Sequence, residues 1–442
     1  MWSVVTWARS PRDSLSVESH VVRPVPASDC QCTGNCGLSP KACWVRHSSE
    51  CVATNWQRWP RCASSPTAAS CAAARCSGGF GVDFSRATED VGSGIALVAQ
   101  RILSHGVTSF CPTLVTSPPE VYHKVLPQIP VKSGGPHGAG VLGVHLEGPF
   151  ISREKRGAHP EAYLRSFEAN AFHDVLATYG SLDNVRIVTL APELDRSLEV
   201  IQALTAQGIC VSLGHSVADL AAAEEAVQNG ATFITHLFNA MLPFHHRDPG
   251  IVGLLTSDQL PPGHCIFYGM IADGIHTNPA ALRIAHRAHP QGLVLVTDAV
   301  PALGLGNGRH TLGQQEVEVD GLIAHIAGTK TLCGSIAPMD VCIRHFLQAT
   351  GCSVESALEA ASLHPAQLLG LEKTKGNLDF GADAGGDQER SSAAAQSWGP
   401  GLSLEAKGVQ EGQKRMSDPL EHRVVLRTER GPGDHQAVSL GP

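Results

Sequence analysis

The sequence predicts an α/β protein built on a parallel β/α barrel of the TIM type. Short apolar segments recur through the centre of the chain, with helical patterns between them. These segments are rich in Val, Ile and Leu and do not alternate with polar residues, as is typical of strands buried on both faces. Four of them stop at a carboxylate or an imidazole, and the carboxyl ends of barrel strands carry the active site. The 442 residues suffice for one barrel of about 250 residues and a smaller domain.

The elements are expected in a regular β/α order. Seven strands are predicted over residues 107–114, 141–146, 185–190, 209–213, 233–235, 266–271 and 293–297. A helix over 216–228 should start at a Ser216 cap and end at Asn229-Gly230, and a helix over 279–289 opens with a proline. A hairpin-like stretch follows at 310–327, and further helices are predicted over 339–350 and 353–369. Repeated units of this kind form a parallel sheet with right-handed crossovers.

A closed barrel of this type needs eight strands, so one is unaccounted for. It should precede Gly78, where the sequence reads SCAAARCS and lacks an apolar run. Residues 1–77 hold most of the 14 cysteines and of the 6 tryptophans and show no sustained period, which favours a disordered leader. The cysteine spacing leaves a zinc or disulfide module open, but no paired knuckle is present. We expect the barrel over 78–384 and a polar, disordered tail over 385–442.

Composition excludes several classes of function. The net charge is -8 and no basic cluster stands out, so nucleic-acid binding has little electrostatic support. No apolar run approaches the roughly 18 residues that a membrane span requires. The N-terminus lacks a basic segment followed by a long apolar one, which argues against a secretory signal. We therefore expect a cytoplasmic enzyme that contacts neither membranes nor nucleic acids.

The side chains at the four strand ends are Glu147, His215, His236 and Asp298. Each has an ordinary explanation when taken alone, such as a glutamate in a turn or an aspartate that caps a helix. Together, a glutamate and two imidazoles at neighbouring strand ends suit a divalent ion, with Zn²⁺ preferred. Such an ion lowers the pKa of water to about 7. The aspartate is then available as the acid and base that moves protons.

Other segments are candidates for substrate binding. His246 and Arg247 belong to a compact basic run that suits a phosphate, although a solvated loop would look the same. Asn239 and Ala240 follow His236 closely, and His276 follows the strand over 266–271. The small-residue loop Leu332, Cys333 and Gly334 would let backbone approach a ligand.

Five motifs carry a resemblance to a known family. In this order and spacing, HLEGPF, SLGHS, THLFNAM, ADGIHTNP and LVTDA resemble the N-acetylglucosamine-6-phosphate deacetylases of the amidohydrolase superfamily, close to the animal cytosolic form. The resemblance covers about residues 78–384. It implies a metal-bearing β/α barrel, flanked by a small β domain that both chain ends build. The implied reaction converts N-acetylglucosamine 6-phosphate to glucosamine 6-phosphate and acetate.

The resemblance also implies roles for individual residues. Glu147, His215 and His236 match the metal ligands, and Asp298 matches the catalytic acid and base. The residues that match sugar-phosphate contacts are Ala158, Asn239, Ala240, His246, Arg247, Asp273, Gly274, Ile275, His276, Leu332, Cys333 and Gly334. The family is homodimeric, and His246 with Arg247 resembles the pair that reaches the phosphate across the interface. The strand over 185–190 has no lysine to bridge two metals, which favours one main metal site.

Both ends depart from the family's pattern. The family's first strand is missing or replaced before Gly78, and the expected strands after residue 384 are absent, so we expect a truncated small β domain. Unpaired barrel edges would then destabilise the chain and impair its activity. Two alternatives stay open: another amidohydrolase that acts on a cyclic amide or a nucleobase, and a catalytically impaired isoform that serves as a subunit.

Overall fold

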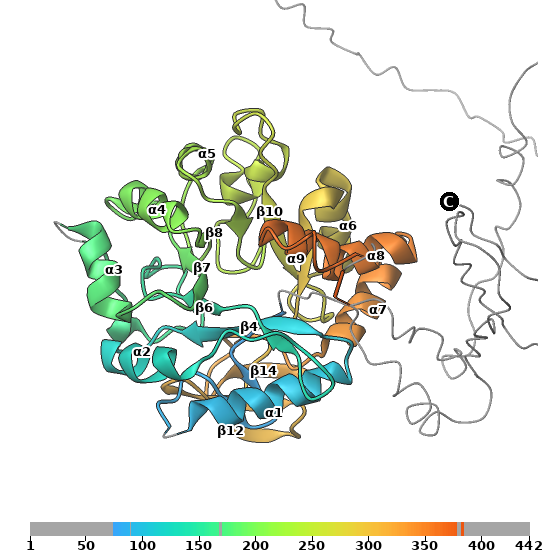
Figure 1. Ribbon diagram of the computed structural model, residues 1–442. Helices are drawn as coiled ribbons and strands as arrows, with labels where there is room; N and C mark the ends of the chain where they lie inside the picture. Colours follow the sequence, from blue (N-terminus) through green and yellow to red (C-terminus); the bar gives the residue numbers. More distant parts are fainter. Residues whose placement is uncertain (1–73, 89, 168–169, 378–381, 384–442) are drawn as a thin grey trace, which may run out of the picture. The chain divides into compact units, whose positions relative to one another are not determined.

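A curled sheet of parallel strands, surrounded by helices, forms the centre of the computed structural model (Figure 1). The structure describes residues 74–88, 90–167, 170–377 and 382–383. The domain boundaries expected at residues 77 and 384 stay predictions, because residues 1–73 of the leader and the tail lie outside the described residues.

Eight parallel strands follow one another around the sheet within the described residues. Their order is β1 (Ala74–Cys76), β4 (Ser109–Val115), β6 (Val144–Glu147), β7 (Val185–Leu190), β8 (Cys210–Leu213), β9 (Phe233–Ile234), β10 (Phe267–Ile271) and β11 (Leu293–Val296). A short strand, β5 (Gly140–Val141), also pairs with β4, and β2 (Gly78–Gly79) pairs with β3 (Val82–Asp83). The seven strands predicted from apolar runs are confirmed, with boundaries shifted by at most a few residues. Spatial order equals chain order, as in a β/α barrel.

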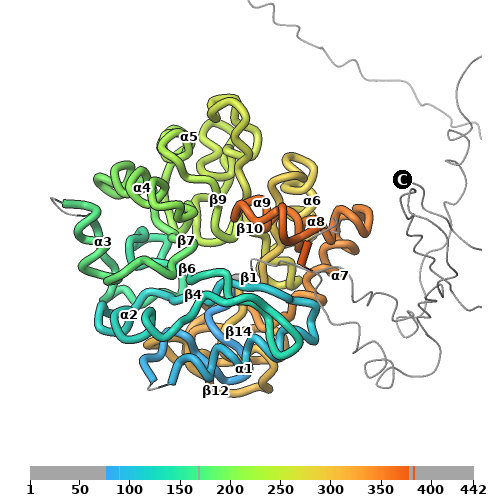
Figure 2. The backbone as a smooth tube through the Cα atoms, in the orientation of Figure 1, coloured from blue at the N-terminus to red at the C-terminus, as the bar shows by residue number. Residues whose placement is uncertain are grey.

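The first strand, expected to be missing or replaced, is present as β1. It pairs in parallel with β4 over three residues (Figure 2). On its other side, the Ser77 amide donates to the Ala299 carbonyl oxygen at 2.8 Å, just beyond β11. Backbone hydrogen bonds do not depend on apolar side chains, so a three-residue ladder forms where no strand pattern predicts one. The β4 edge that we expected to be unpaired therefore has β1 as its partner, and a single bridge between Cys76 and Ala299 links β1 to the segment after β11.

Helices connect most successive strands of the sheet and lie outside it, and three further helices follow the last strand (Figure 1). They are α1 (Val91–Leu103), α2 (Pro119–Val125), α3 (Ala171–Tyr179), α4 (Ser197–Ala206), α5 (Leu220–Gln228), α6 (Pro279–Ala288), α7 (Met339–Thr350), α8 (Val354–Ala361) and α9 (Leu363–Leu368). Among the described residues, no helix has the length and apolarity that crossing a membrane requires.

Two helix predictions need correction. Helix α5 begins at Leu220 rather than at residue 216, because Asp219 caps it by accepting a hydrogen bond from the Ala222 amide. The Ser216 hydroxyl instead donates to Glu193 at 2.6 Å. The single helix expected over 353–369 is two helices, α8 and α9. Pro365 lacks an amide proton and its ring would collide with the carbonyl four residues earlier, so the helix breaks before it.

A small antiparallel sheet follows the barrel strands. It consists of β12 (Gly308–Leu312), β13 (Gln315–Asp320) and β14 (Ile323–Ile326), which confirms the hairpin-like pattern. Val317 and Val319 of β13 are buried in a cluster with Leu312, Ala324 and Cys333. This cluster brings the small sheet against the loop that contains Cys333.

Strand alternation divides the barrel interior into layers. Successive inward positions on a strand are two residues apart, so residues from neighbouring strands form rings. A mostly apolar ring comprises Cys111, Ile187, Cys210, Phe233 and Val294, and Leu369 packs against it. Two residues further along their strands come the buried Thr113, Thr189, Ser212 and Thr235, with His145 beside them. These five residues, the polar ring, separate the apolar interior from the strand ends on five of the strands, whereas Val296 on β11 is apolar.

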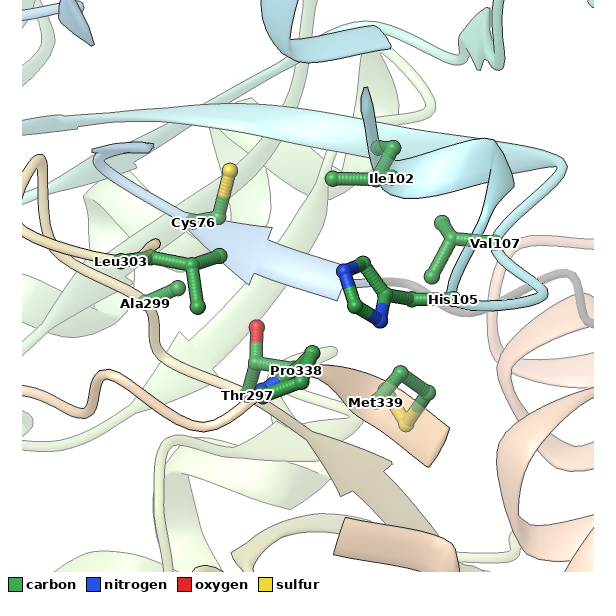
Figure 3. Close-up of a pocket in the computed structure, with 9 residues that line it drawn as sticks. All are labelled: Cys76, Ile102, His105, Val107, Thr297, Ala299, Leu303, Pro338 and Met339. Carbon is green, nitrogen blue, oxygen red and sulfur yellow. The ribbon is translucent and has the colours of Figure 1, made fainter. Parts of the chain in front are cut away.

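A small pocket lies between β1, α1 and α7 (Figure 3). Apolar side chains such as Cys76, Ile102, Leu303 and Met339 line most of it. Its volume of about 20 Å³ suits a single water molecule. None of the residues expected to bind a metal or substrate lines it, so we interpret it as a packing defect beside the barrel closure.

Candidate active site at the strand ends

Three of the four strand-end side chains converge on one point. The Glu147 Oε1 atom lies 3.1 Å from His215 Nε2 and 3.3 Å from His236 Nε2. The two imidazole Nε2 atoms are 3.1 Å apart. All three residues are buried, with exposed fractions of 3 to 5%. The structure thus brings together the carboxylate and both imidazoles that the strand-end pattern selected.

This trio fits a divalent metal ion. Two ligand atoms bound about 2.1 Å from a tetrahedral zinc ion lie roughly 3.4 Å apart, close to the separations observed. His215 Nδ1 lies 2.9 Å from the Lys155 carbonyl oxygen, which places the ring proton on Nδ1 and leaves the Nε2 lone pair directed at the trio. A carboxylate and two imidazoles form a donor set that zinc and similar ions accept.

The site residues after β8, β9 and β11 have left-handed backbone conformations. The φ angles are 51° at His215, 27° at His236 and 50° at Asp298. Residues other than glycine rarely adopt this region, and it persists where the surrounding structure enforces it, often at functional sites. Each strand ends two residues before its site residue, so the turn directs the side chain over the barrel mouth.

A third imidazole near Glu147, that of His159, was not selected from the sequence. One donor atom each of Glu147, His159 and His215 lie within 4.8 Å of one another, and His159 is buried. Its Nδ1 atom accepts a hydrogen bond from the Thr116 amide at 3.3 Å, so the neutral ring carries its proton on Nε2. His159 therefore suits hydrogen-bond donation better than metal ligation. It lies in a loop 12 residues beyond β6, so the strand-end pattern could not identify it; adjacency to Ala158 was the only signal.

Asp298 lies near residues of two other segments. Its carbonyl oxygen accepts from the Ser335 amide at 2.8 Å. Its carboxylate is close enough to His276 and Cys333 to influence both. Burial, with the charge of Asp298, raises the pKa of the Cys333 thiol to about 12, so this cysteine stays protonated. Asp298 thus occupies the side of the mouth formed by β10, β11 and the loop after β14.

Asp273 and His276 form a buried pair beyond β10. The Asp273 carboxylate lies 2.7 Å from His276 Nδ1 and also accepts from the Ile275 and His276 amides. Burial opposes charge on both groups, but their mutual hydrogen bond raises the pKa of His276 and lowers the pKa of Asp273. Gly274 has a φ of 82°, and a Cβ there would lie 2.8 Å from the His345 ring. The pair favours a charged imidazolium next to Asp298.

The remaining predicted contact residues lie on loops. Asn239 and Ala240 lie three and four residues after His236 and are half-buried. The loop with His246 and Arg247 is exposed to solvent, beside the exposed ring of Phe244.

Two further loops carry the other predicted contacts. Leu332 is exposed and Cys333 is buried, while Gly334 approaches the Asp298 carbonyl oxygen so closely that a Cβ would lie 2.6 Å from it. The Ala158 carbonyl oxygen accepts a hydrogen bond from the Gln315 side chain, which links the loop after Glu147 to β13.

Comparisons with known proteins agree with this geometry. Residues 85–385 match the amidohydrolase family. The chain is 95% identical over 307 residues to the N-acetylglucosamine-6-phosphate deacetylase of Mus musculus, covering 70% of this chain and 75% of that protein. The N-acetylglucosamine-6-phosphate deacetylase of Thermotoga maritima superimposes with a TM-score of 0.61 at 29% identity, covering 70% of this chain and 80% of the other.

A third relative was solved with a ligand. A mutant N-acetyl-D-glucosamine-6-phosphate deacetylase from Mycobacterium smegmatis, in complex with N-acetyl-D-glucosamine-6-phosphate, superimposes with a TM-score of 0.58 at 33% identity. The match covers 67% of this chain and 76% of that one. The family match, the barrel and the strand-end carboxylate with its imidazoles agree: the chain belongs to the amidohydrolase family.

Proposed function

We propose that this protein hydrolyses the N-acetyl group of N-acetylglucosamine 6-phosphate with the help of one divalent cation, Zn²⁺ being preferred. The observation that carries the proposal is the convergence of Glu147 Oε1, His215 Nε2 and His236 Nε2 within 3.1 to 3.3 Å at the barrel mouth. The names of the relatives supply the substrate.

Glu147, His215 and His236 would hold the cation. When bound, the ion supplies Lewis-acid chemistry that polarises a carbonyl oxygen and lowers the pKa of water. Asp298 accepts the proton of the attacking water and delivers it to nitrogen as the C–N bond breaks. His159 donates from Nε2 to the carbonyl oxygen as negative charge develops there. The products are glucosamine 6-phosphate and acetate.

The loops around the mouth would bind the sugar phosphate. Arg247 is exposed and cationic, and the exposed His246 can donate a hydrogen bond, which suits a phosphate dianion. We propose that they act across a homodimer, in the cytoplasm, while Asn239, Ala240, His276 and the loop from Leu332 to Gly334 contact the sugar and its acetyl group. Binding energy from the distant phosphate would then orient the amide at the metal.

The substrate can be tested with a small panel. The purified full chain, loaded with Zn²⁺ or Co²⁺, is offered N-acetylglucosamine 6-phosphate, N-acetylglucosamine, a hydantoin and adenine. We expect acetate from the phosphorylated sugar, with kcat/KM at least about 100-fold above that of the unphosphorylated sugar. Hydrolysis of the hydantoin or deamination of adenine without acetate release would instead support the cyclic-amide or nucleobase alternative. A folded, metal-loaded chain that acts on none of them would support the impaired isoform.

A further inference from the structure

A chain of buried hydrogen bonds crosses the barrel interior beneath the candidate metal ligands. Its members come from, or directly follow, the five neighbouring strands β4, β6, β7, β8 and β9. None is more than 1% exposed. In order along the chain of bonds they are Ser212, Thr235, Thr189, His145 and Thr113.

The distances make this chain continuous. Ser212 Oγ lies 2.5 Å from Thr235 Oγ1, which lies 2.8 Å from Thr189 Oγ1. Thr189 Oγ1 is 2.8 Å from His145 Nε2, and His145 Nδ1 is 3.2 Å from Thr113 Oγ1. One direction satisfies every group: each hydroxyl donates to the next member, a neutral His145 donates from Nδ1, and Thr113 donates to the Cys111 carbonyl. Thr189 occupies the middle, and its loss would break two links.

Packing alone does not explain a polar ring at this depth. Barrel interiors are usually filled by branched aliphatic side chains. Burying hydroxyls and an imidazole costs free energy unless every one of them is hydrogen-bonded. A ring of valines and leucines would fill the same space without that requirement. The polar ring therefore calls for a role other than filling volume.

The ring directly adjoins the candidate ligands. His145 precedes Glu147 by two residues on β6, so both side chains lie on the same face of the strand. Thr189 is the register partner of Glu147 across β6 and β7. Thr235 immediately precedes His236 and packs so tightly against Gly214 that a Cβ there would lie 2.5 Å from its own Cβ. The hydroxyl-bearing residues thus contact the backbone segments that aim the ligands.

The backbone at His215 and His236 depends on the surrounding structure to hold its conformation. His215 and His236 have φ angles of 51° and 27°, which side-chain-bearing residues hold only where the surroundings enforce them. The chain of hydrogen bonds links the strands just below both residues and fixes them relative to β6.

We propose that the chain of hydrogen bonds from Ser212 to Thr113 positions Glu147, His215 and His236 for metal binding, with Thr189 as its central positioning residue. This inference rests on the proposed metal site, and it concerns affinity for the ion rather than the identity of the substrate. Removing the Thr189 hydroxyl changes no ligand, yet it loosens the strand ends that carry them.

The test is the affinity of the full-length chain for Zn²⁺, measured by competition with a chromophoric chelator. Thr189→Val keeps the shape of the side chain and removes both hydrogen bonds. We expect its dissociation constant for Zn²⁺ to rise about 10- to 100-fold. Thr189→Ser keeps the hydroxyl and should stay within about 3-fold of the parent. The visible absorption of bound Co²⁺, which reports ligand geometry, should change in Thr189→Val and not in Thr189→Ser.

A matched control comes from another buried threonine. Thr178 on α3 is fully buried, and within the part of the chain that the structure describes its hydroxyl has no hydrogen-bond partner. Thr178→Val makes the same chemical change away from the chain of hydrogen bonds. Its Zn²⁺ affinity should equal that of the parent.

Equal Zn²⁺ affinities in Thr189→Val and Thr178→Val would overturn the proposal. If Thr189→Val does not fold, Ser212→Ala decides, because it removes only the terminal link: a several-fold weaker affinity supports the proposal and an unchanged affinity overturns it. A parent chain that binds Zn²⁺ but releases no acetate would count against the proposed substrate and leave this inference standing.

Discussion

At the scale of single residues, charge and geometry at Glu147 decide whether the trio can hold an ion. Glu147→Gln keeps the shape of the side chain but removes the negative charge that two imidazoles cannot replace. We expect bound zinc to fall from about one ion per chain to below about 0.1 ion per chain, because the substitution weakens a metal ligand itself and not only its orientation. Elemental analysis after dialysis measures this.

The control for that substitution is Glu161→Gln, which alters an exposed glutamate paired with Arg153. It should retain the full zinc content. Full zinc content in Glu147→Gln would show that the ion binds elsewhere.

The pair of Asp273 and His276 should make stability depend on pH. The pKa of His276 is raised above its ordinary 6.5. Its contribution to the free energy of unfolding is therefore complete below about pH 6.5 and is lost as the pH rises through the raised pKa. The pKa of Asp273 is lowered from 3.8, so its contribution is present above about pH 4 and is lost as pH falls through the lowered value. The pair therefore stabilises the fold most between about pH 4 and 6.5.

Asp273→Asn should lower the free energy of unfolding by about 2 kcal/mol inside that window, because a charge-assisted hydrogen bond is lost. The deficit should shrink at higher pH, as chemical denaturation at pH 6 and pH 9 would measure. Asp258→Asn, at an exposed aspartate, should show no such trend. An equal deficit at both pH values would contradict the assignment of the pair.

The residue types at the strand ends sufficed to predict which side chains converge as candidate metal ligands. They did not predict the backbone conformations that orient these side chains. The sequence predicted Glu147, His215 and His236 because each follows an apolar run, and these three are adjacent in the structure. It could not predict the left-handed turns that aim the histidines, because backbone strain depends on the surrounding packing. His159 was not identified from the sequence, because it lies in a loop, where no hydrophobic periodicity indicates its position near the site.

At the scale of elements, the three-residue strand β1 and Ser77 after it link the two ends of the parallel sheet. The Ser77 amide and hydroxyl both donate to the Ala299 carbonyl oxygen, at 2.8 and 3.1 Å. Ser77→Pro removes both donors and should lower the free energy of unfolding by about 2 kcal/mol. Ser77→Ala removes only the hydroxyl and should cost about 1 kcal/mol or less.

Denaturant midpoints of the two variants would test this closure. Equal denaturant midpoints for Ser77→Pro and the parent would contradict this account and would support the expectation that the barrel lacks its first strand.

The elements themselves were predictable wherever side chains dictated them. Strand β7 (Val185–Leu190) and helix α7 (Met339–Thr350) have the predicted bounds, because apolar runs and helical periodicity there agree with the fold. Strand β1 was not predictable, since backbone pairing alone makes it. The start of α5 was misplaced because two residues could cap it, and Glu193 engages Ser216.

At the scale of the whole molecule, the barrel arranges its chemistry in layers. Apolar residues such as Ile187 and Phe233 fill the interior, hydroxyls and His145 form the ring above them, and the ligands occupy the strand ends. The loop that carries Cys333 lies beside Asp298 at the strand ends. This order places the reacting groups away from the packed core while rigid strands hold them.

The central claim is that the metal held by Glu147, His215 and His236, together with Asp298, hydrolyses the N-acetyl group. The most direct test titrates Zn²⁺ into the metal-free full chain and follows acetate release from N-acetylglucosamine 6-phosphate, alongside Asp298→Asn. The claim predicts that turnover rises in proportion to bound zinc up to one ion per chain. It also predicts that Asp298→Asn binds the same zinc with kcat lower by about 10²- to 10⁴-fold. Acetate release that is independent of zinc, or full turnover in Asp298→Asn, would contradict it.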